Sequence, residues 1–240
     1  MFKHETQVIK FLLQWYSVNA RNLPWRKKNN LDLPDPYFVF VSEYMLQQTT
    51  VNTVKNKFNE FILKWPSLNK LAQTSEPNIL KFWSGLGYYS RARNLLKSAK
   101  IIKKNFKNNI PKTYDELIQL PGIGDYTAKA ILGIGYNKSV MPLDANIERI
   151  LVRLHAIDKP INKVKNKLKD LGKNFISDKY SSNLIQSFMD YGSEICLPRN
   201  PKCNICGINK FCQSYKKNLQ QKIPLKPVSY THLRAHETSE

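Results

Sequence analysis

All four cysteines of the chain lie in one short segment, CLPRNPKCNICGINKFC, at positions Cys196, Cys203, Cys206 and Cys212. Their spacing is C-x6-C-x2-C-x5-C, and the rest of the 240-residue sequence contains no cysteine. Four thiolates so close together can hold either a tetrahedral zinc ion or a cubane iron–sulfur cluster, because both accept an all-cysteine ligand set. Structural zinc usually takes two C-x2-4-C pairs, and only one C-x2-C pair is present here. The spacing leaves both kinds of metal site open.

Disulfide bonds are the other use of clustered cysteines, and they depend on the compartment. The sequence has no run of eighteen apolar residues, so no transmembrane helix and no membrane partner are predicted. The first residues, MFKHETQVIKFLLQWY, contain too short and too interrupted an apolar run for a signal peptide. These features predict a cytoplasmic protein, in which clustered cysteines bind metal more often than they form disulfides.

The charge of the chain points to a polyanionic partner. Lysine and arginine outnumber aspartate and glutamate by 38 to 18, a formal net charge of +20. Such a surplus is typical of nucleic-acid binding that weakens as salt is added. An AT-rich genome is the alternative, since Lys, Asn and Ile are abundant, but it explains many lysines and not the shortage of acids.

Apolar residues recur at helical spacing along most of the chain. Val8, Phe11, Leu12 and Trp15 follow the i, i+3, i+4, i+7 pattern. Similar patterns run through residues 37–48, 51–64, 88–107, 124–136, 144–156, 161–177 and 180–192, with proline and glycine between them. Alternating strand patterns are scarce, so the sequence predicts an all-α fold of about ten helices.

The last residues, VSYTHLRAHETSE at 228–240, have no apolar periodicity and depart from the lysine-rich composition before them. We interpret them as a non-native tail, with an ordinary disordered tail as the alternative.

A glycine-containing turn opens one of the predicted helices. In LPGIGDYTAKAIL, residues 120–132, Gly122 and Gly124 let the backbone approach a partner closely. The free N–H groups at the start of the helix favour phosphate. A plain corner between two helices is the alternative for this segment alone.

Two acidic residues, Glu43 and Asp144, occupy positions that can be either structural or functional. In SEYMLQQTT, Glu43 falls on a mostly apolar helix face, where an unpaired carboxylate is costly. Either a structural hydrogen bond satisfies it, or it is a general acid whose pKa the apolar site raises. In MPLDANIERIL, Asp144 precedes a helix and would by default be its N-cap, with Asn146 at the surface.

The segment GLGYYSRARNL, residues 85–95, places two tyrosines between glycines and arginines. This arrangement suits stacking on bases, although the aromatic rings could also belong to the core. Arg91 and Arg93 are expected to lie near phosphates.

Together these motifs resemble the helix-hairpin-helix DNA glycosylases of the endonuclease III and adenine DNA glycosylase superfamily. The cysteine spacing is similar to their [4Fe–4S] loop, LPGIG to their phosphate-binding hairpin, and Pro-x-Asp at Asp144 to their catalytic segment. SE-x-M-L-Q-Q-T looks most like A/G-specific adenine DNA glycosylases of the MutY type, with Glu43 at the position of the catalytic glutamate. The resemblance spans residues 1–215.

The resemblance implies a role for each matching residue. The implied catalytic residues are Glu43, Asp144, Tyr126 and Asn146, and the implied adenine pocket contains Gln186, Trp25 and Arg26. The implied DNA contacts are Gln48, Leu86, Tyr88, Gly122, Gly124, Arg91 and Arg93. The implied cofactor is a [4Fe–4S] cluster held by Cys196, Cys203, Cys206 and Cys212.

The activity implied is that of a monofunctional glycosylase. Bifunctional relatives carry a lysine where this sequence has Tyr126, and Lys129, one helical turn on, does not take that place. The expected reaction is hydrolysis of adenine mispaired with guanine or 8-oxoguanine in double-stranded DNA, by a monomer associated with the nucleoid. The alternatives are an endonuclease III-type lyase, which needs the missing lysine, and a non-catalytic iron–sulfur DNA-binding protein.

The resemblance also implies two helical subdomains with the active site in the cleft between them. Residues 29–139 are expected to form a six-helix barrel with the helix-hairpin-helix, and residues 1–28 with 140–215 an iron–sulfur subdomain. Residues 216–227 are expected to begin a linker to a C-terminal recognition domain that this sequence does not contain. The segment between Trp25 and Glu43 is a few residues longer than expected for the family.

Overall fold

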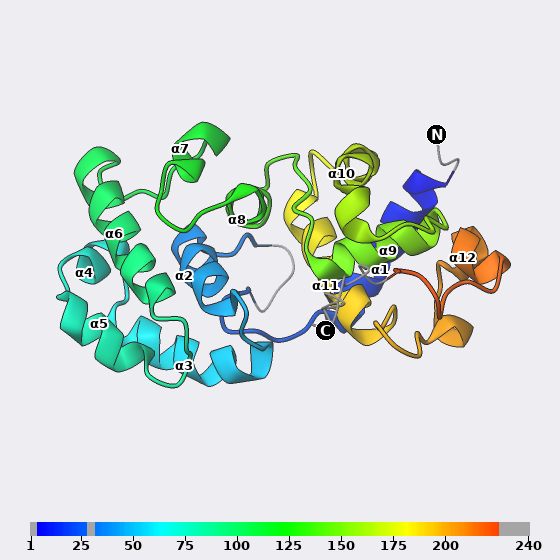
Figure 1. Cartoon of the computed structure of the whole chain (residues 1–240). Helices are drawn as coiled ribbons and strands as arrows, with labels where there is room; N and C mark the ends of the chain where they lie inside the picture. The colour runs from blue at the N-terminus through cyan, green and yellow to red at the C-terminus, as the bar shows by residue number, and fades with distance from the viewer. Residues whose placement is uncertain (1–3, 28–31, 226–240) are drawn as a thin grey trace, which may run out of the picture.

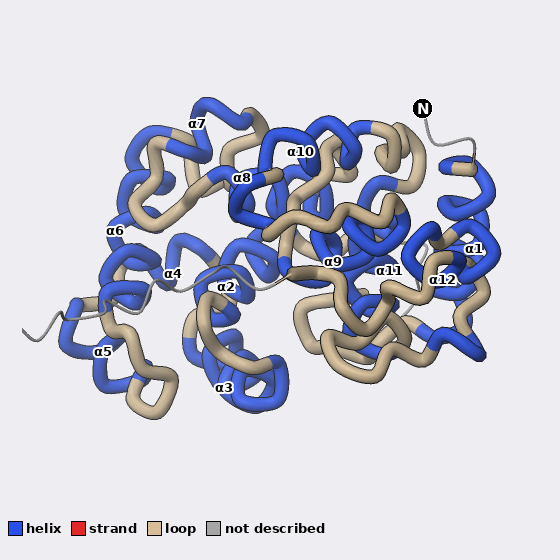
Figure 2. Tube along the Cα trace, turned by 45° about the vertical axis from the view of Figure 1, so that its right-hand side comes forward, coloured by secondary structure: helices blue, strands red, loops and turns tan. Residues whose placement is uncertain are grey.

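The computed structural model describes residues 4–27 and 32–225. These residues form helices and loops without a strand, as Figure 2 shows, and the all-α prediction is confirmed. The α-helices are α1 (Glu5–Asn19), α2 (Pro36–Leu46), α3 (Val51–Lys64), α4 (Leu68–Ala72), α5 (Glu76–Trp83), α6 (Ser90–Asn105), α7 (Tyr114–Ile118), α8 (Asp125–Ala130), α9 (Ala145–Leu154), α10 (Lys165–Lys173), α11 (Ser181–Glu194) and α12 (Gln213–Lys216). None of the described helices is long and apolar enough to cross a membrane.

The helices form two groups that stand side by side in Figure 1. We call α2 to α8 the first lobe, and α1 with α9 to α12 the second lobe. The chain starts in the second lobe, crosses to build the first, and returns, so that α1 packs against α11. The predicted boundary at residues 28 and 29 and the tail at 228–240 lie outside the described residues, and the predicted subdomain limits stay a prediction.

A π-helix, η1 (Ile131–Gly135), follows α8 directly and joins the two lobes. It packs against α2 and α8 in the first lobe and against α11 in the second. A Cβ atom at Gly133 would lie 2.2 Å from Cδ1 of Ile185 on α11, so any larger residue there would require the Ile185 side chain to shift. The contact fixes the two lobes beneath the site that lies between them.

Local capping explains where several helices begin. Asp35 accepts a hydrogen bond from the N–H of Tyr37 at 2.8 Å, and Pro36 occupies the first position of α2. Thr50, Ser67 and Thr113 cap α3, α4 and α7 in the same way. The start of α2 sets the rotation of a helix whose later turns carry Glu43.

The turn between α7 and α8 is the predicted hairpin, and it is anchored from inside. Leu120 and Ile123 are buried, and Gly122 has a φ of 81°, in the left-handed region. The carbonyl of Pro121 accepts hydrogen bonds from the hydroxyls of Tyr44 on α2 and Ser98 on α6. The hairpin therefore has a fixed position relative to the helix that carries Glu43.

Candidate active site

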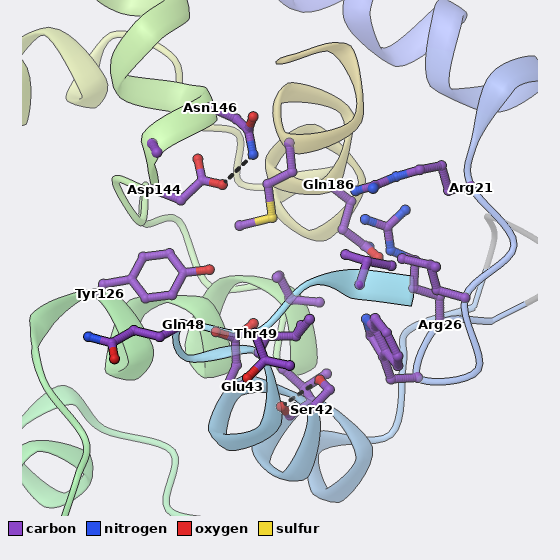
Figure 3. Close-up of a pocket in the computed structure, with 18 residues that line it drawn as sticks. Arg21, Arg26, Ser42, Glu43, Gln48, Thr49, Tyr126, Asp144, Asn146 and Gln186 are labelled. Carbon is purple, nitrogen blue, oxygen red and sulfur yellow. Dashed lines mark hydrogen bonds between the residues drawn. The ribbon is translucent and has the colours of Figure 1, made fainter. Parts of the chain in front are cut away.

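A cavity of about 450 Å³ opens between the two lobes. The first lobe contributes Glu43 and Tyr126 to its wall, and the second contributes Asp144, Asn146 and Gln186 (Figure 3). Cavities of this size take small ligands such as a single nucleobase. Side chains about a hundred residues apart in sequence thus meet at one site.

Glu43 is the buried acid of this cavity, with 7% of its surface exposed. Burial raises the pKa of its carboxyl to about 7, while a hydrogen bond with Tyr126 opposes the rise. The nearby Asp144 raises the pKa further and Arg26 lowers it. At neutral pH the carboxyl is therefore protonated in a large fraction of molecules and can give a proton to a ligand.

Asp144 is both the N-cap of α9 and a wall residue of the cavity. Its Oδ1 accepts from the N–H of Ile147 at 2.7 Å, and its Oδ2 accepts from Nδ2 of Asn146 at 2.9 Å (Figure 3). Burial raises the pKa of Asp144, and these hydrogen bonds and Arg149 oppose the rise. Because Asp144 receives more donors than Glu43, we assign the negative charge of the pair to Asp144 and the proton to Glu43.

From the sequence alone, Asn146 is expected to be a free surface residue. In the structure its side chain is instead held by hydrogen bonds. Its Oδ1 accepts from Nη2 of Arg149 at 2.8 Å, while its amide donates to Asp144. Arg149 in turn donates through Nε to the carbonyl of Cys196 at 2.7 Å. The orientation of Asp144 is thus connected, through two side chains, to the cysteine segment.

Gln186 brings an unpaired acceptor to the cavity. The side chain is 3% exposed, and its Nε2 donates to the carbonyl and the hydroxyl of Ser182, both at 3.1 Å. Its Oε1 is buried without a hydrogen-bond partner among the described residues. A buried acceptor of this kind is costly unless a ligand supplies the donor.

Trp25 and Arg26 form the remaining predicted wall. Both line the cavity, and Arg26 is held by a bidentate ion pair with Asp190 at 2.7 and 3.0 Å. Arg21 joins the same carboxylate through its backbone N–H and Nε. Although burial alone would raise the pKa of Asp190, the two arginines hold it below its usual range.

The sequence alone did not point to Asp190 or Arg21. Asp190 lies one helical turn after Gln186 on α11 and is fully buried. The sequence did contain one signal for Asp190: it lies four residues after Gln186, so on a helix the two side chains share one face.

The predicted DNA contacts fall into two groups. Gln48 and Tyr88 are exposed, Gly122 and Gly124 lie in the hairpin, and the exposed Arg93 pairs with Glu76 at 2.8 Å. Leu86, in contrast, has a buried side chain with 6% of its surface exposed.

Arg91 was expected to lie near a phosphate, and the structure instead buries it. Its side chain is 5% exposed and its guanidinium donates to backbone carbonyls inside the first lobe. In this arrangement it has no surface to offer to a phosphate. The sequence shows the charge of an arginine but not whether the fold buries it.

The four cysteines line a second cavity, in the second lobe, together with Tyr191 and Arg153. Nη1 of Arg153 donates to Sγ of Cys196 at 3.3 Å, and the hydroxyl of Tyr191 donates to Sγ of Cys206 at 3.2 Å. Arg153 is 2% exposed, and its other acceptors among the described residues are carbonyl oxygens. A buried cation with neutral acceptors fits a site whose thiolates bring negative charge.

Four thiols that line one cavity are a donor set that a [4Fe–4S] cluster accepts, because each thiolate can bind one iron. A zinc ion accepts four thiolates as well, with all four sulfurs around one point. Within residues 4–27 and 32–225, no three His, Cys, Asp or Glu side chains are arranged around a single metal ion.

Comparison with known proteins agrees with the fold and the motifs. Residues 41–174, more than half of the chain, match the family described as "HhH-GPD superfamily base excision DNA repair protein". The chain is 41% identical over 220 residues to the adenine DNA glycosylase of Buchnera aphidicola subsp. Schizaphis graminum, covering 90% of this chain and 62% of the relative. It is 35% identical over 232 residues to the human adenine DNA glycosylase, covering 93% of this chain and 42% of the relative. The chain thus spans less than two thirds of these relatives.

Solved structures show the same architecture. A thermostable thymine-DNA glycosylase superimposes with a TM-score of 0.78 at 25% identity, covering 90% of this chain and 98% of that one. Endonuclease III in a non-covalent DNA complex gives a TM-score of 0.69 at 19% identity, with the same coverage, and shows the fold alone. The all-α fold and the superfamily prediction are confirmed, and the chain belongs to the HhH-GPD superfamily of base excision DNA repair proteins.

Proposed function

We propose that this chain is the glycosylase part of an adenine DNA glycosylase. It would extrude an adenine mispaired with guanine or 8-oxoguanine from double-stranded DNA and hydrolyse the bond between base and sugar. The observation that carries the proposal is the burial of Glu43, which raises its pKa to about 7, in the wall of a nucleobase-sized cavity that Asp144 also lines. The names of the relatives, adenine DNA glycosylases in Buchnera and in human, support the choice of base.

Gln186 supports the choice of a base that carries an amino group. Its buried Oε1 needs a donor, and the exocyclic N6 amine of adenine is one. Trp25 would pack against the flat base, and the ion pair with Asp190 would hold Arg26 at the pocket wall.

The chemistry begins with the leaving group. Adenine leaves poorly as an anion, so Glu43 would protonate a ring nitrogen as the glycosidic bond breaks and its electron pair moves onto the base. The sugar becomes oxocarbenium-like, and the Asp144 carboxylate would stabilise its positive charge. Water would then add to the sugar and return a proton to Glu43. Two carboxyls in one site with different protonation states meet the requirement for both steps.

The reaction would leave the strand intact. Lyase chemistry in this superfamily is expected to need a lysine amine at the position of Tyr126, and a tyrosine cannot form a Schiff base there. Tyr126 instead lies against Glu43, to which it makes a hydrogen bond.

The cysteines would hold a [4Fe–4S] cluster whose contribution is structural, because it would cross-link the loop at four points. That loop carries Arg199, Lys202 and Lys210, which are exposed and would reach the DNA backbone. The hairpin N–H groups around Gly122 and Gly124 would bind a second stretch of phosphate, and Tyr88 and Gln48 would enter the base stack. We expect the protein to act as a monomer on nucleoid DNA.

Single-turnover assays on a duplex with adenine opposite 8-oxoguanine test the proposal. We expect strand breaks only after alkali, and a loss of about a thousandfold or more in Glu43→Gln, since general acid catalysis contributes 10²–10⁴-fold. Breaks without alkali would instead favour a lyase. Adenine release by Glu43→Gln at the unaltered rate would exclude Glu43 as the acid, and no release by the parent protein would reject the adenine glycosylase.

A further inference from the structure

Arg91 is the most highly connected buried cation of the first lobe. Nη1 donates to the carbonyls of Tyr44, at 3.2 Å, Met45, at 2.8 Å, and Gln47, and Nη2 donates to those of Leu86, at 2.7 Å, and Gly87, at 3.1 Å. Its carbon Cζ also lies 5.6 Å from the ring centres of both Trp83 and Tyr88. The planar guanidinium presents several donors in a rigid fork, which an ammonium cannot do.

The carbonyls come from two segments that are far apart in sequence. Tyr44, Met45 and Gln47 belong to the last turn of α2 and its C-cap, where helical carbonyls lack intrahelical partners. Because the last turn of α2 contains no basic residue, Arg91 supplies the cation that this end of the helix favours. Leu86 and Gly87 belong to the loop between α5 and α6.

Each segment leads directly to an exposed residue, Gln48 in one case and Tyr88 in the other, and we call these two residues the tips. Gln48 follows the C-cap of α2 with a φ of 55°, and Tyr88 follows Gly87 with a φ of 46°. Both side chains are exposed, Tyr88 to 62%. Left-handed backbone in residues with a side chain costs energy and persists where the surroundings hold it.

We infer that Arg91 is a positioning residue that locks the Gln48 and Tyr88 tips into one arrangement, so that both enter a duplex together. The inference rests on the proposed function, in which these tips enter the base stack. Opening the stack costs a few kcal/mol. Two tips already fixed by the fold lose little further conformational entropy on binding, whereas two mobile loops would have to be ordered at the same moment.

The decisive experiment compares two substrates. In the first, adenine is paired opposite 8-oxoguanine; in the second, adenine lies opposite an abasic site and is already unpaired. Arg91→Gln removes the guanidinium with its fork of donors. Arg91→Lys also removes the guanidinium but keeps the positive charge and a similar volume, and it serves if Arg91→Gln folds poorly. Lys100→Gln removes an exposed cation from the same helix, α6, and is the matched control.

We expect both Arg91 variants to lose about 100-fold in single-turnover rate on the paired substrate and to recover most of that loss on the unpaired one. Lys100→Gln should match the parent protein on both. An equal loss on the two substrates would overturn the inference, because Arg91 would then support the pocket rather than base extrusion. An unaltered rate on the paired substrate would overturn it as well.

A second measurement does not depend on which base is released. With 2-aminopurine beside the mismatch, the parent protein should raise the fluorescence on binding by unstacking the probe, and Arg91→Gln should bind with little increase. A full increase in Arg91→Gln would overturn the inference. If the parent protein unstacks the probe but releases no adenine, the proposed function fails while the role of Arg91 is still decided.

Discussion

At the scale of single residues, burial raises the pKa of one acid of the site, Glu43, to about 7. Glu43 has 7% of its surface exposed, and its carboxyl has one hydrogen-bond donor, Tyr126, against several around Asp144. The apolar environment that raises the pKa of Glu43 also makes its ionised form costly to the folded state.

This cost gives Glu43→Gln a pH-dependent effect on stability. The folded pKa is about 7 and the reference value is 4.5, so between these values the folded state binds the proton more tightly and the free energy of unfolding falls as pH rises. Glutamine has the same size and no charge. We expect the variant to be more stable than the parent by up to about 3 kcal/mol near pH 9, and by little near pH 4.5.

Urea denaturation of both proteins at the two pH values measures this difference. A stability difference that does not change with pH would mean that Glu43 ionises in the folded protein as easily as in the unfolded chain.

Residue identities were the most predictable part of the site. Glu43, Asp144, Tyr126 and Gln186 were singled out from the sequence by resemblance, and the structure gathers them around one cavity. Arg91 was misread as a phosphate contact, because a one-dimensional motif cannot distinguish a surface arginine from one that fills a buried hole between carbonyls. The role of each residue in catalysis stays a prediction.

At the scale of elements, the hairpin between α7 and α8 depends on two glycines for different reasons. Gly122 has a φ of 81°, and a Cβ atom there would lie 3.0 Å from Cβ of Asn94. Gly124 has a φ of −103°, which any residue can adopt, and a Cβ atom there would meet nothing within 4 Å. Gly122 is thus required by the fold, and Gly124 leaves open space for a partner.

Alanine substitutions distinguish the structural requirement for Gly122 from the open space that Gly124 leaves for a partner. Gly122→Ala should lower the free energy of unfolding by about 1–3 kcal/mol, through backbone strain and crowding. Gly124→Ala should change it by less than about 1 kcal/mol, yet weaken DNA binding, since the added methyl group occupies the space that a phosphate needs. Thermal unfolding and a titration with duplex DNA give the two quantities. Equal destabilisation by both substitutions would contradict this account.

Long amphipathic helices were predictable and short ones were not. The pattern at 51–64 coincides with α3, whereas α4 and α7, of five residues each, are too short for an apolar period to show. The pattern at 124–136 predicted one helix, and the structure has α8 followed by the π-helix η1. The sequence ILGIG is apolar on all sides, so it carries no sign of the changed hydrogen-bond register.

At the scale of the whole molecule, the cysteine loop depends on something other than apolar burial. Most residues between Cys196 and Cys206 are at least partly exposed, and the loop contains only short 3-10 turns. A bound metal cluster would supply folding free energy that the small core of such a segment does not. The hydrogen bonds of Arg149 and Arg153 then transmit the order of the loop to α9, which carries Asp144 at its N-cap.

Cys203→Ser tests this dependence. We expect the variant to lose bound iron and the yellow-brown colour, and its affinity for duplex DNA to fall by about tenfold or more as the ordered cations of the loop are lost. Ile205→Ala, at a position 68% exposed in the same loop, should keep both. Metal analysis that finds zinc rather than iron in the parent protein would reject the cluster.

The packing of α1 against α11 also affects how the molecule is made. On a ribosome α1 emerges before its partner, residues Ser181–Glu194, which follows only after the entire first lobe has been synthesised. During that interval the apolar face of α1, with Val8 and Leu12 fully buried in the finished protein, has no permanent cover. Contacts of such high sequence separation form late and slowly. We therefore expect this face of α1 to stay uncovered, and the cleft between the two lobes to stay open, until α11 has been synthesised.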